Sequence, residues 1–150
     1  MRAVIQRVSQ ASVSIDEKKV ASINEGILVL LGIETQDTKE DSEWLSNKIS
    51  SLRIFSDKDG KMNKSVTEVN GEVIVVSQFT LHAKTKKGNR PSYIKASRPE
   101  HAIPLYEQFK KDLSDVTGKE VQSGEFAADM KVSLTNDGPV TIIIDTKNKE

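Results

Sequence analysis

Two short segments combine residue types that can build a binding site mainly from backbone groups. Asn136–Thr141 contains Gly138 followed by Pro139 between two strand-like stretches. This dipeptide is stiff and poor in side chains, so its carbonyl groups are open to a ligand. Ser77–Leu81 places polar residues at the end of the apolar run Val73–Val76. Backbone N–H groups at such a strand end can stabilise a developing oxyanion.

Side chains typical of acid–base catalysis are scarce. The chain has no cysteine, which excludes disulfides, thiolate metal sites and Cys nucleophiles. Its only histidines are His82 and His101, and we expect His101 at the surface. A Ser-His-Asp triad would need Ser77 or Thr80 beside one of them. His82 lies two residues beyond Thr80 on a strand-like path, yet no nearby residue supplies the acid. The Thr80 hydroxyl is either a nucleophile or part of an ordinary strand residue, and the second reading is favoured.

No metal-binding pattern is complete. Paired cysteines and the HExxH pattern are absent. The segment Asp57–Asn63 resembles part of a calcium loop, and Glu68 stands at the twelfth position counted from Asp57. However, Gly60 is fourth in this segment, whereas a calcium loop needs glycine sixth. We therefore expect a turn here and no metal site.

Arg7 is unusual because it continues the apolar face that Ala3 and Ile5 form on an alternating strand. It is either an exposed edge charge or a buried anchor. An unpaired charge on an apolar face costs several kcal/mol. We therefore expect Arg7 to have buried partners, namely backbone carbonyls or polar groups of the loop Asn136–Pro139.

Charge is balanced overall, with 22 basic and 22 acidic residues, but it is distributed unevenly. No Asp or Glu occurs between Val73 and Pro99. That stretch carries six basic residues, here called the basic window: Lys84, Lys86, Lys87, Arg90, Lys95 and Arg98. It indicates either a polyanionic partner or a solvated loop. Met1–Arg7 is unlike a signal peptide, and no apolar run is long enough to span a membrane. We expect a cytoplasmic protein.

The hydrophobic pattern predicts many strands and two helices. The first helix is predicted to begin at Thr38, with Trp44, Leu45, Ile49 and Leu52 as its apolar stripe. The second has Ser97 as its cap, Pro99 just inside and Gly118 at its end. Its apolar stripe is Ile103, Tyr106, Phe109, Leu113 and Val116. Strands are expected at 2–8, 11–15, 20–23, 27–33, 52–55, 72–81, 120–122, 129–135 and 140–145. We predict one α+β domain over residues 1–150, a layered β/β/α sandwich of mainly antiparallel strands with both helices on one side.

Several motifs resemble those of the D-aminoacyl-tRNA deacylase family. Ser77–Leu81 and Asn136–Thr141 are similar to its two signature motifs. The opening Met1–Val13 and the segment Gly88–Tyr93 also resemble that family, and the similarity extends along the whole chain in the right order. One residue departs from the family pattern, because Ala127 follows Phe126 where the family has glycine. The extra methyl group is expected to shift the local backbone.

The resemblance implies an enzyme that hydrolyses the ester bond between a D-amino acid and the 3′ end of tRNA, and also removes mischarged glycine. It implies a homodimer in which a cis Gly138–Pro139 peptide enters the partner's site. It implies contact with the acceptor end of tRNA, and no cofactor, metal, membrane or DNA. The implied catalytic residues are Ser77, Gln78, Phe79 and Thr80, with the N–H groups of Phe79 and Thr80 facing the oxyanion. The implied substrate-binding residues are Gly138, Pro139, Arg7, Asn136, Phe126 and Met130.

Two alternatives remain at the level of sequence. A non-catalytic RNA-binding module would use the same basic face, with Phe79 and Tyr93 as stacking platforms. Only 5% of the residues are aromatic, which weakens this alternative. The second alternative is an esterase that acts on an unrelated small ester. Release of amino acid from charged tRNA, compared with hydrolysis of a short ester, distinguishes all three.

Overall fold

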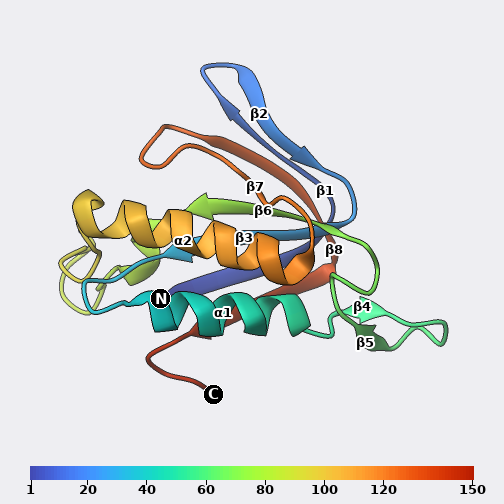
Figure 1. The fold of residues 1–150 in the computed structure, drawn as a ribbon. Helices are drawn as coiled ribbons and strands as arrows, with labels where there is room; N and C mark the ends of the chain where they lie inside the picture. The colour runs from blue at the N-terminus through green and yellow to red at the C-terminus, as the bar shows by residue number, and fades with distance from the viewer.

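The computed structural model describes residues 1–150 and shows a mixed α+β architecture (Figure 1). The elements, in chain order, are β1 (Arg2–Ile15), β2 (Lys18–Ile23), β3 (Gly26–Gly32), α1 (Lys39–Ser51), β4 (Phe55–Ser56), β5 (Met62–Lys64), β6 (Glu72–Ser77), the 3₁₀ helix η1 (Phe79–His82), α2 (Pro99–Thr117), β7 (Gln122–Ser123) and β8 (Lys131–Asp145). The main sheet has the order β2-β1-β3-β6-β7, and β8 also pairs with β1. Strand β1 pairs antiparallel with β2, β3 and β8, whereas β6 is parallel to β3 and β7.

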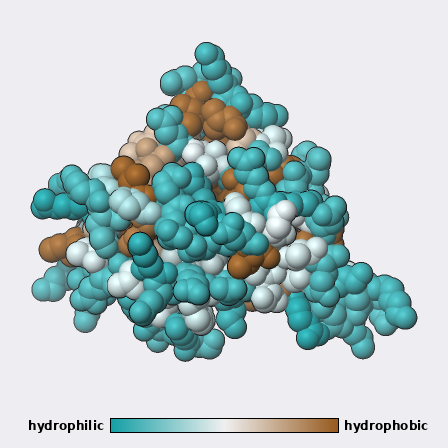
Figure 2. All heavy atoms as spheres, viewed as in Figure 1, coloured by the Kyte–Doolittle hydropathy of each residue, from teal (hydrophilic) through white to brown (hydrophobic).

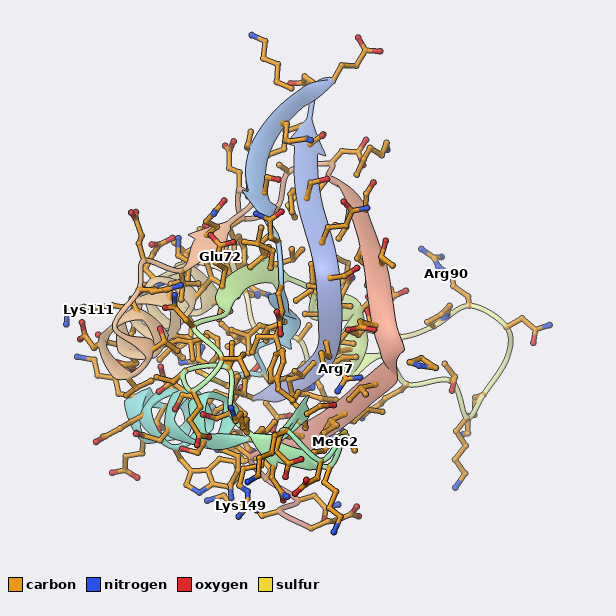
Figure 3. All side chains as sticks on the ribbon, turned by 90° about the vertical axis from the view of Figure 1, so that its right-hand side faces the viewer. Arg7, Met62, Glu72, Arg90, Lys111 and Lys149 are labelled. Atoms are coloured by element: carbon orange, nitrogen blue, oxygen red, sulfur yellow. The ribbon has the colours of Figure 1, made fainter.

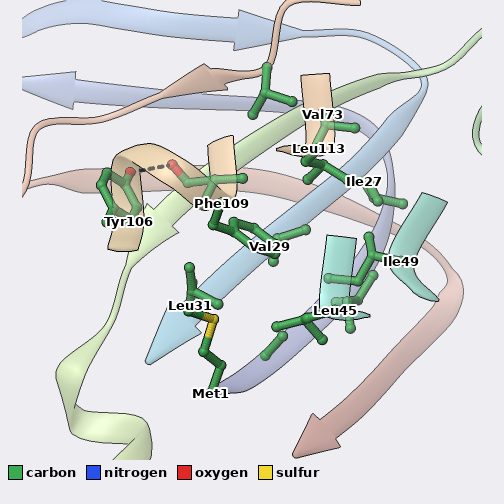
Figure 4. Close-up of a cluster of buried hydrophobic side chains, with 14 of the residues drawn as sticks. Met1, Ile27, Val29, Leu31, Leu45, Ile49, Val73, Tyr106, Phe109 and Leu113 are labelled. Atoms are coloured by element: carbon green, nitrogen blue, oxygen red, sulfur yellow. Dashed lines mark hydrogen bonds between the residues drawn. The ribbon is translucent and has the colours of Figure 1, made fainter. Parts of the chain in front are cut away.

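Two hydrophobic clusters lie on opposite faces of β3 and β6. Alternate residues of β3 separate between them: Ile27 and Val29 face the larger cluster and Leu28 faces the smaller one. The larger cluster includes Leu45 and Ile49 of α1 together with Phe109 and Leu113 of α2 (Figure 4). Val132 and Leu134 of β8 pack against the smaller cluster. Both helices therefore cover one side of the sheet, and the predicted layered α+β class is confirmed.

Local signals determine where the helices begin and end. Thr38 caps α1, and the Asp41 carboxylate accepts a hydrogen bond from the Thr38 N–H at 2.9 Å. Pro99 occupies the first turn of α2, and Gly118 ends it at φ 72°. The predicted cap of α2 was wrong by one residue, because Arg98 and not Ser97 is the N-cap.

The predicted apolar stripes of the helices were only partly right. Ile103 and Val116 of α2 are exposed, and Trp44 is half-buried against the core. Figure 2 shows that hydrophilic residues cover most of the face on which the helices lie, with hydrophobic residues in separate patches. Single exposed apolar side chains are normal on such a surface.

Several strand predictions need correction. The strands predicted at 2–8 and 11–15 are one continuous strand, β1. The strand predicted at 120–122 is at Gln122–Ser123 instead. The strand predicted at 72–81 ends at Ser77, and residues 79–82 form η1. The two strands predicted near the C-terminus are one continuous strand, β8, because it pairs with β1 on both sides of its central irregularity. The short strand predicted at 52–55 is at Phe55–Ser56 instead. No helix of the chain is both long enough and apolar enough to cross a membrane.

Asp41 joins the C-terminal segment to α1. We expect this contact to make the free energy of unfolding depend on pH in the acidic range. Burial alone would raise the pKa of the Asp41 carboxyl group, but hydrogen bonds from Lys147, Thr146 and the Thr38 N–H outweigh it and hold the pKa well below its usual 3.8. Because this pKa is lower in the folded state, the contribution is complete above pH 3.8 and is lost as the pH falls below that value.

The variant Lys147→Met should lower the free energy of unfolding at pH 6 but have a smaller effect at pH values well below the usual Asp pKa of about 3.9. Urea unfolding at pH 6 and at the lowest pH where the protein remains folded measures the difference. Lys111→Met is the matched control, because its partner Asp115 is exposed. An equal loss of unfolding free energy at both pH values would contradict the conclusion that Lys147 stabilises the fold by pairing with the ionised Asp41.

Candidate functional site

A pocket of about 520 Å³ opens where β3 and β6 end. Twelve of its 17 lining residues are hydrophobic, so its polar groups are few. Its walls come from the β6–η1 junction, the loop before α2 and the loop before β8. The lining residues are Leu31, Ile33, Val76, Ser77, Gln78, Phe79, Tyr93, Ala96, Ser97, Pro99, Ala102, Phe126, Ala127, Ala128, Asp129, Met130 and Val132.

The segment Ser77–Thr80 forms one wall because the chain turns out of β6. The Gln78 N–H still donates to the Leu31 carbonyl at 2.8 Å, which holds the turn on the end of β3. The Gln78 side-chain amide donates to the Thr80 hydroxyl oxygen at 2.5 Å. Phe79 is 55% exposed and meets Tyr93 edge to face, with ring centroids 5.0 Å apart. Ser77, Gln78 and Phe79 line the pocket, whereas Thr80 is not one of its lining residues.

The loop before α2 forms a second wall. The Thr35 N–H donates to the Lys95 carbonyl at 3.3 Å, and the Ser97 N–H donates to the Ile33 carbonyl at 2.9 Å. These bonds fix the loop to the chain that continues from β3. Tyr93 was considered from sequence only as a stacking platform, and Ser97 only as a helix cap. The sequence signal that could have identified this wall is the polar residue Ser97, which lies between the aromatic Tyr93 and the start of α2.

The loop before β8 forms a third wall of the pocket and contributes Phe126 and Met130. Phe126 packs edge to face on Tyr106, with ring centroids 5.6 Å apart. Burial raises the pKa of Tyr106 to about 12, and its hydroxyl donates to the Val75 carbonyl at 3.1 Å, so this group stays protonated. Ala127 has φ 64°, a left-handed conformation that favours glycine. The departure at Ala127 therefore falls at a backbone position where a methyl group is costly.

Arg7 holds the turn that contains Gly138. Its Nε donates to the Asp137 carbonyl at 2.8 Å, and its Nη1 donates to the Ile54 carbonyl at 2.6 Å. Arg7 contacts a backbone carbonyl of this loop, as expected. The expectation that its partners are buried was wrong for the loop, because Asp137 lies at the surface. Figure 3 shows Arg7 beside β1 and β8. The Gly138–Pro139 peptide is cis. Inside the turn, the Asn136 side chain accepts a hydrogen bond from the Val140 N–H at 2.8 Å.

The structure thus separates the two signature motifs within one chain. Ser77, Gln78 and Phe79 line the pocket together with Phe126 and Met130. By contrast, no pocket-lining residue comes from the segment 136–141 or from Arg7. Asp137, Gly138 and Pro139 are exposed on the surface of the chain.

Neither histidine forms a triad with Thr80. His82 ends η1 and is buried, with Nδ1 4.0 Å from the Glu34 carboxylate and Nε2 without a hydrogen-bond partner. The idea that His82 shares a strand face with Thr80 was wrong, because these residues lie on a 3₁₀ turn and not on a strand. His101 is exposed, as predicted, and its Nδ1 lies 2.6 Å from the Ser97 hydroxyl.

Residues 57–61 form a turn, as predicted, but Met62 and Asn63 belong to strand β5. The Asp57 carboxylate accepts hydrogen bonds from the N–H groups of Asp59 and Lys61 and from the Asn63 amide. These bonds hold the pKa of Asp57 below its usual value, with the Asn63 amide as the largest contribution.

The basic window lies beside the pocket. Lys84, Lys86, Lys87 and Arg90 are exposed on a loop whose ends are joined by reciprocal hydrogen bonds between Lys84 and Ser92. Figure 3 shows Arg90 on this loop, which projects away from the body of the protein. The loop ends at Ser92, directly before Tyr93 of the pocket wall.

Comparison with known proteins agrees with this arrangement. A family model described as D-Tyr-tRNA(Tyr) deacylase matches residues 4–145. Proteins named D-aminoacyl-tRNA deacylase from Flavobacterium psychrophilum and Bacteroides fragilis are 68% and 65% identical, each over the full length of both chains. A solved structure titled c-Myc DNA Unwinding Element Binding Protein is similar with a TM-score of 0.91 and 40% identity, covering 97% of this chain and 98% of that one. A probable eukaryotic D-amino acid tRNA deacylase shares the fold, with a TM-score of 0.83 and 17% identity over 95% and 97% of the two chains.

Proposed function

Because the chain belongs to the D-Tyr-tRNA(Tyr) deacylase family, we propose that its pocket carries out the hydrolysis of D-aminoacyl-tRNA. The protein is a hydrolase, and its products are free D-amino acid and tRNA. The observation that carries this proposal is the placement of Ser77, Gln78 and Phe79 on the wall of an apolar pocket beside the basic window. The whole chain, residues 1–150, acts as one domain in this proposal. We place its action in the cytoplasm, where charged tRNA is used.

The wall at η1 supplies the groups that stabilise the transition state. The N–H groups of Phe79 and Thr80 are the oxyanion donors, since they belong to the turn that forms this wall. The Thr80 hydroxyl is not the nucleophile, because its partner is the Gln78 amide, which cannot act as a base. An ester to a ribose hydroxyl is already labile, so a positioned water and an oxyanion site suffice.

The exposed Gly138–Pro139 turn completes the site of a second copy of the chain. Its absence from the pocket of its own protomer supports a homodimer in which each turn enters the partner's pocket. Strand β8 pairs only with β1, and its Ile143 is 69% exposed. An unpaired strand edge carrying an exposed apolar side chain is typical of a surface that another copy covers.

Rejection of L-amino acids follows from the rigidity of this turn. Its carbonyl groups hold the α-amino group of the substrate and leave no volume for an L side chain. Arg7 fixes the turn through the Asp137 carbonyl, and Asn136 fixes it from within. Phe126 and Met130 supply the apolar wall opposite η1. Glycine has no side chain to reject, so glycine mischarged on tRNA is also hydrolysed.

The activity is tested by measuring amino acid release from D-tyrosyl-tRNA and L-tyrosyl-tRNA at equal concentrations. We expect hydrolysis of the D form and sparing of the L form. Hydrolysis of glycyl-tRNA shows whether a substrate without a side chain escapes chiral rejection. Hydrolysis of D-tyrosine methyl ester shows whether a small ester without tRNA is also a substrate. Equal rates on both enantiomers would overturn chiral selection. Binding of both charged tRNAs without release would instead identify an RNA-binding module.

A further inference from the structure

Ser97 and His101 form a polar pair at the pocket that the proposed catalytic groups do not use. The Ser97 hydroxyl oxygen lies 2.6 Å from His101 Nδ1, one helical turn further along the chain. Ser97 is not the cap of α2, and the N-cap Arg98 makes no side-chain capping bond. The Ser97 hydroxyl is therefore directed to the imidazole and not to the helix end.

Ser97 also belongs to the lining of the pocket. Its N–H is tied to the Ile33 carbonyl at 2.9 Å, so its position on the wall is fixed by β3. It is half-buried, whereas His101 is exposed outside the wall. The imidazole thus holds the hydroxyl of a residue that lines the pocket.

We propose that Ser97 and His101 are positioning residues that hold the terminal nucleoside of the tRNA, with the Ser97 oxygen accepting a hydrogen bond from it. This inference rests on the proposed function, because it assumes that the pocket receives the aminoacylated 3′ end. Arg98, the last member of the basic window, follows Ser97 directly in the chain. The polynucleotide arrives over that window, so Ser97 lies on the nucleotide side of the pocket and not on the amino acid side.

The direction of the hydrogen bond follows from the chemistry of the pair. In the imidazole tautomer with hydrogen on Nε2, Nδ1 is an acceptor, and the Ser97 O–H donates to it. The lone pairs of the hydroxyl oxygen remain for a donor in the pocket. The terminal adenosine offers two kinds of donor, the ribose 2′-hydroxyl and the adenine amino group. In a mostly apolar lining, such an acceptor favours ligands that present a hydrogen-bond donor to it. A ligand polar group that cannot pair with it would lose its hydrogen bond to water without gaining another.

The test uses 3′-(D-tyrosylamino)-3′-deoxyadenosine, whose amide link resists hydrolysis, and measures its dissociation constant by calorimetry. A neutral hydrogen bond contributes about 0.5–1.5 kcal/mol, so Ser97→Ala should weaken binding by about two- to tenfold. His101→Leu should give a smaller loss by freeing the hydroxyl to rotate. In the Ser97→Ala background, His101→Leu should add nothing, because the group it orients is gone. With D-aminoacyl-tRNA, both variants should raise KM with little change in kcat.

Two further analogues identify the donor, one lacking the 2′-hydroxyl and one with a dimethylated adenine amino group. The analogue without the donor should bind the wild type more weakly and lose nothing further in Ser97→Ala. Unchanged affinity of Ser97→Ala for the parent analogue, or an equal loss with all three analogues, would overturn the proposal. Melting temperatures show whether a loss reflects folding, and His101→Leu, at an exposed position, keeps the test valid if Ser97→Ala is unstable. Hydrolysis of D-tyrosyl-tRNA by the wild type is the separate control for the proposed function.

Discussion

Arg7→Ala should lose most of its activity on D-aminoacyl-tRNA, by roughly 100-fold, because a displacement of about 1 Å at a positioned group has an effect of this size. Arg7 joins the Asp137 carbonyl to the Ile54 carbonyl. Without it, the turn carrying Gly138 and Pro139 has lost the hydrogen bonds that link it to the loop after α1. Rates on D- and L-tyrosyl-tRNA under single-turnover conditions measure the loss and any gain of L-substrate hydrolysis.

The fold should survive this change, because the Arg7 partners are backbone carbonyls that water can reach once the side chain is gone. We expect a loss of about 1–2 kcal/mol in the free energy of unfolding, as for hydrogen bonds to a charged group. Arg7→Lys should restore little activity, since an ammonium group cannot reproduce the two directions of the guanidinium fork. Unchanged rates on both enantiomers in Arg7→Ala would show that Arg7 is an ordinary edge charge.

Gly138→Ala provides an independent disturbance of the same turn. A Cβ atom at Gly138 would lie 2.8 Å from Val140 Cγ2 and 3.0 Å from Arg7 Nη2, at φ 143°. The added methyl group therefore presses on the arginine that holds the turn. We expect this variant to reproduce the Arg7→Ala profile on the two enantiomers.

Reversal of Lys84, Lys86 and Lys87 to Glu should raise KM for D-aminoacyl-tRNA strongly and make it less sensitive to salt. These side chains are exposed on the loop that ends beside Tyr93 of the pocket wall. Figure 3 shows this loop, marked by Arg90, projecting from the body of the protein. If each binds one phosphate, the slope of log affinity against log salt falls by about two to three. The measurement is KM between low and moderate salt, for charged tRNA and for an aminoacyl-adenosine fragment.

The fragment distinguishes phosphate binding from a role in shaping the pocket. It lacks the polynucleotide, so its hydrolysis should barely change in the triple variant. Reversal of Lys58 and Lys61 in the β4–β5 hairpin is the control, since these lysines are also exposed but belong to a different loop (Figure 1). Equal losses on tRNA and fragment would mean that the loop supports the wall of the pocket.

Sequence alone determined the features that depend on neighbours along the chain. Thr38, Pro99 and Gly118 mark helix boundaries because capping and backbone conformation act within one turn. Alternation of apolar residues identified the main strands, and the two motifs with their order along the chain identified the family. The apolar face of the first strand was also enough to predict that Arg7 needs backbone partners.

Only the tertiary structure decided which of these parts meet. The 3₁₀ turn at Phe79 interrupts a pattern that is typical of a strand. The Gln78 N–H still pairs with Leu31 across the sheet, but the Gln78 carbonyl accepts a hydrogen bond from the Leu81 N–H, which closes the turn. The joining of two predicted strands into β8 depends on pairing with β1, more than 100 residues away. The Ser97–His101 pair became a pocket feature only because Ser97 is anchored to Ile33. Hydrogen bonds and packing between distant residues leave no local pattern, so they emerge only when the chain is folded.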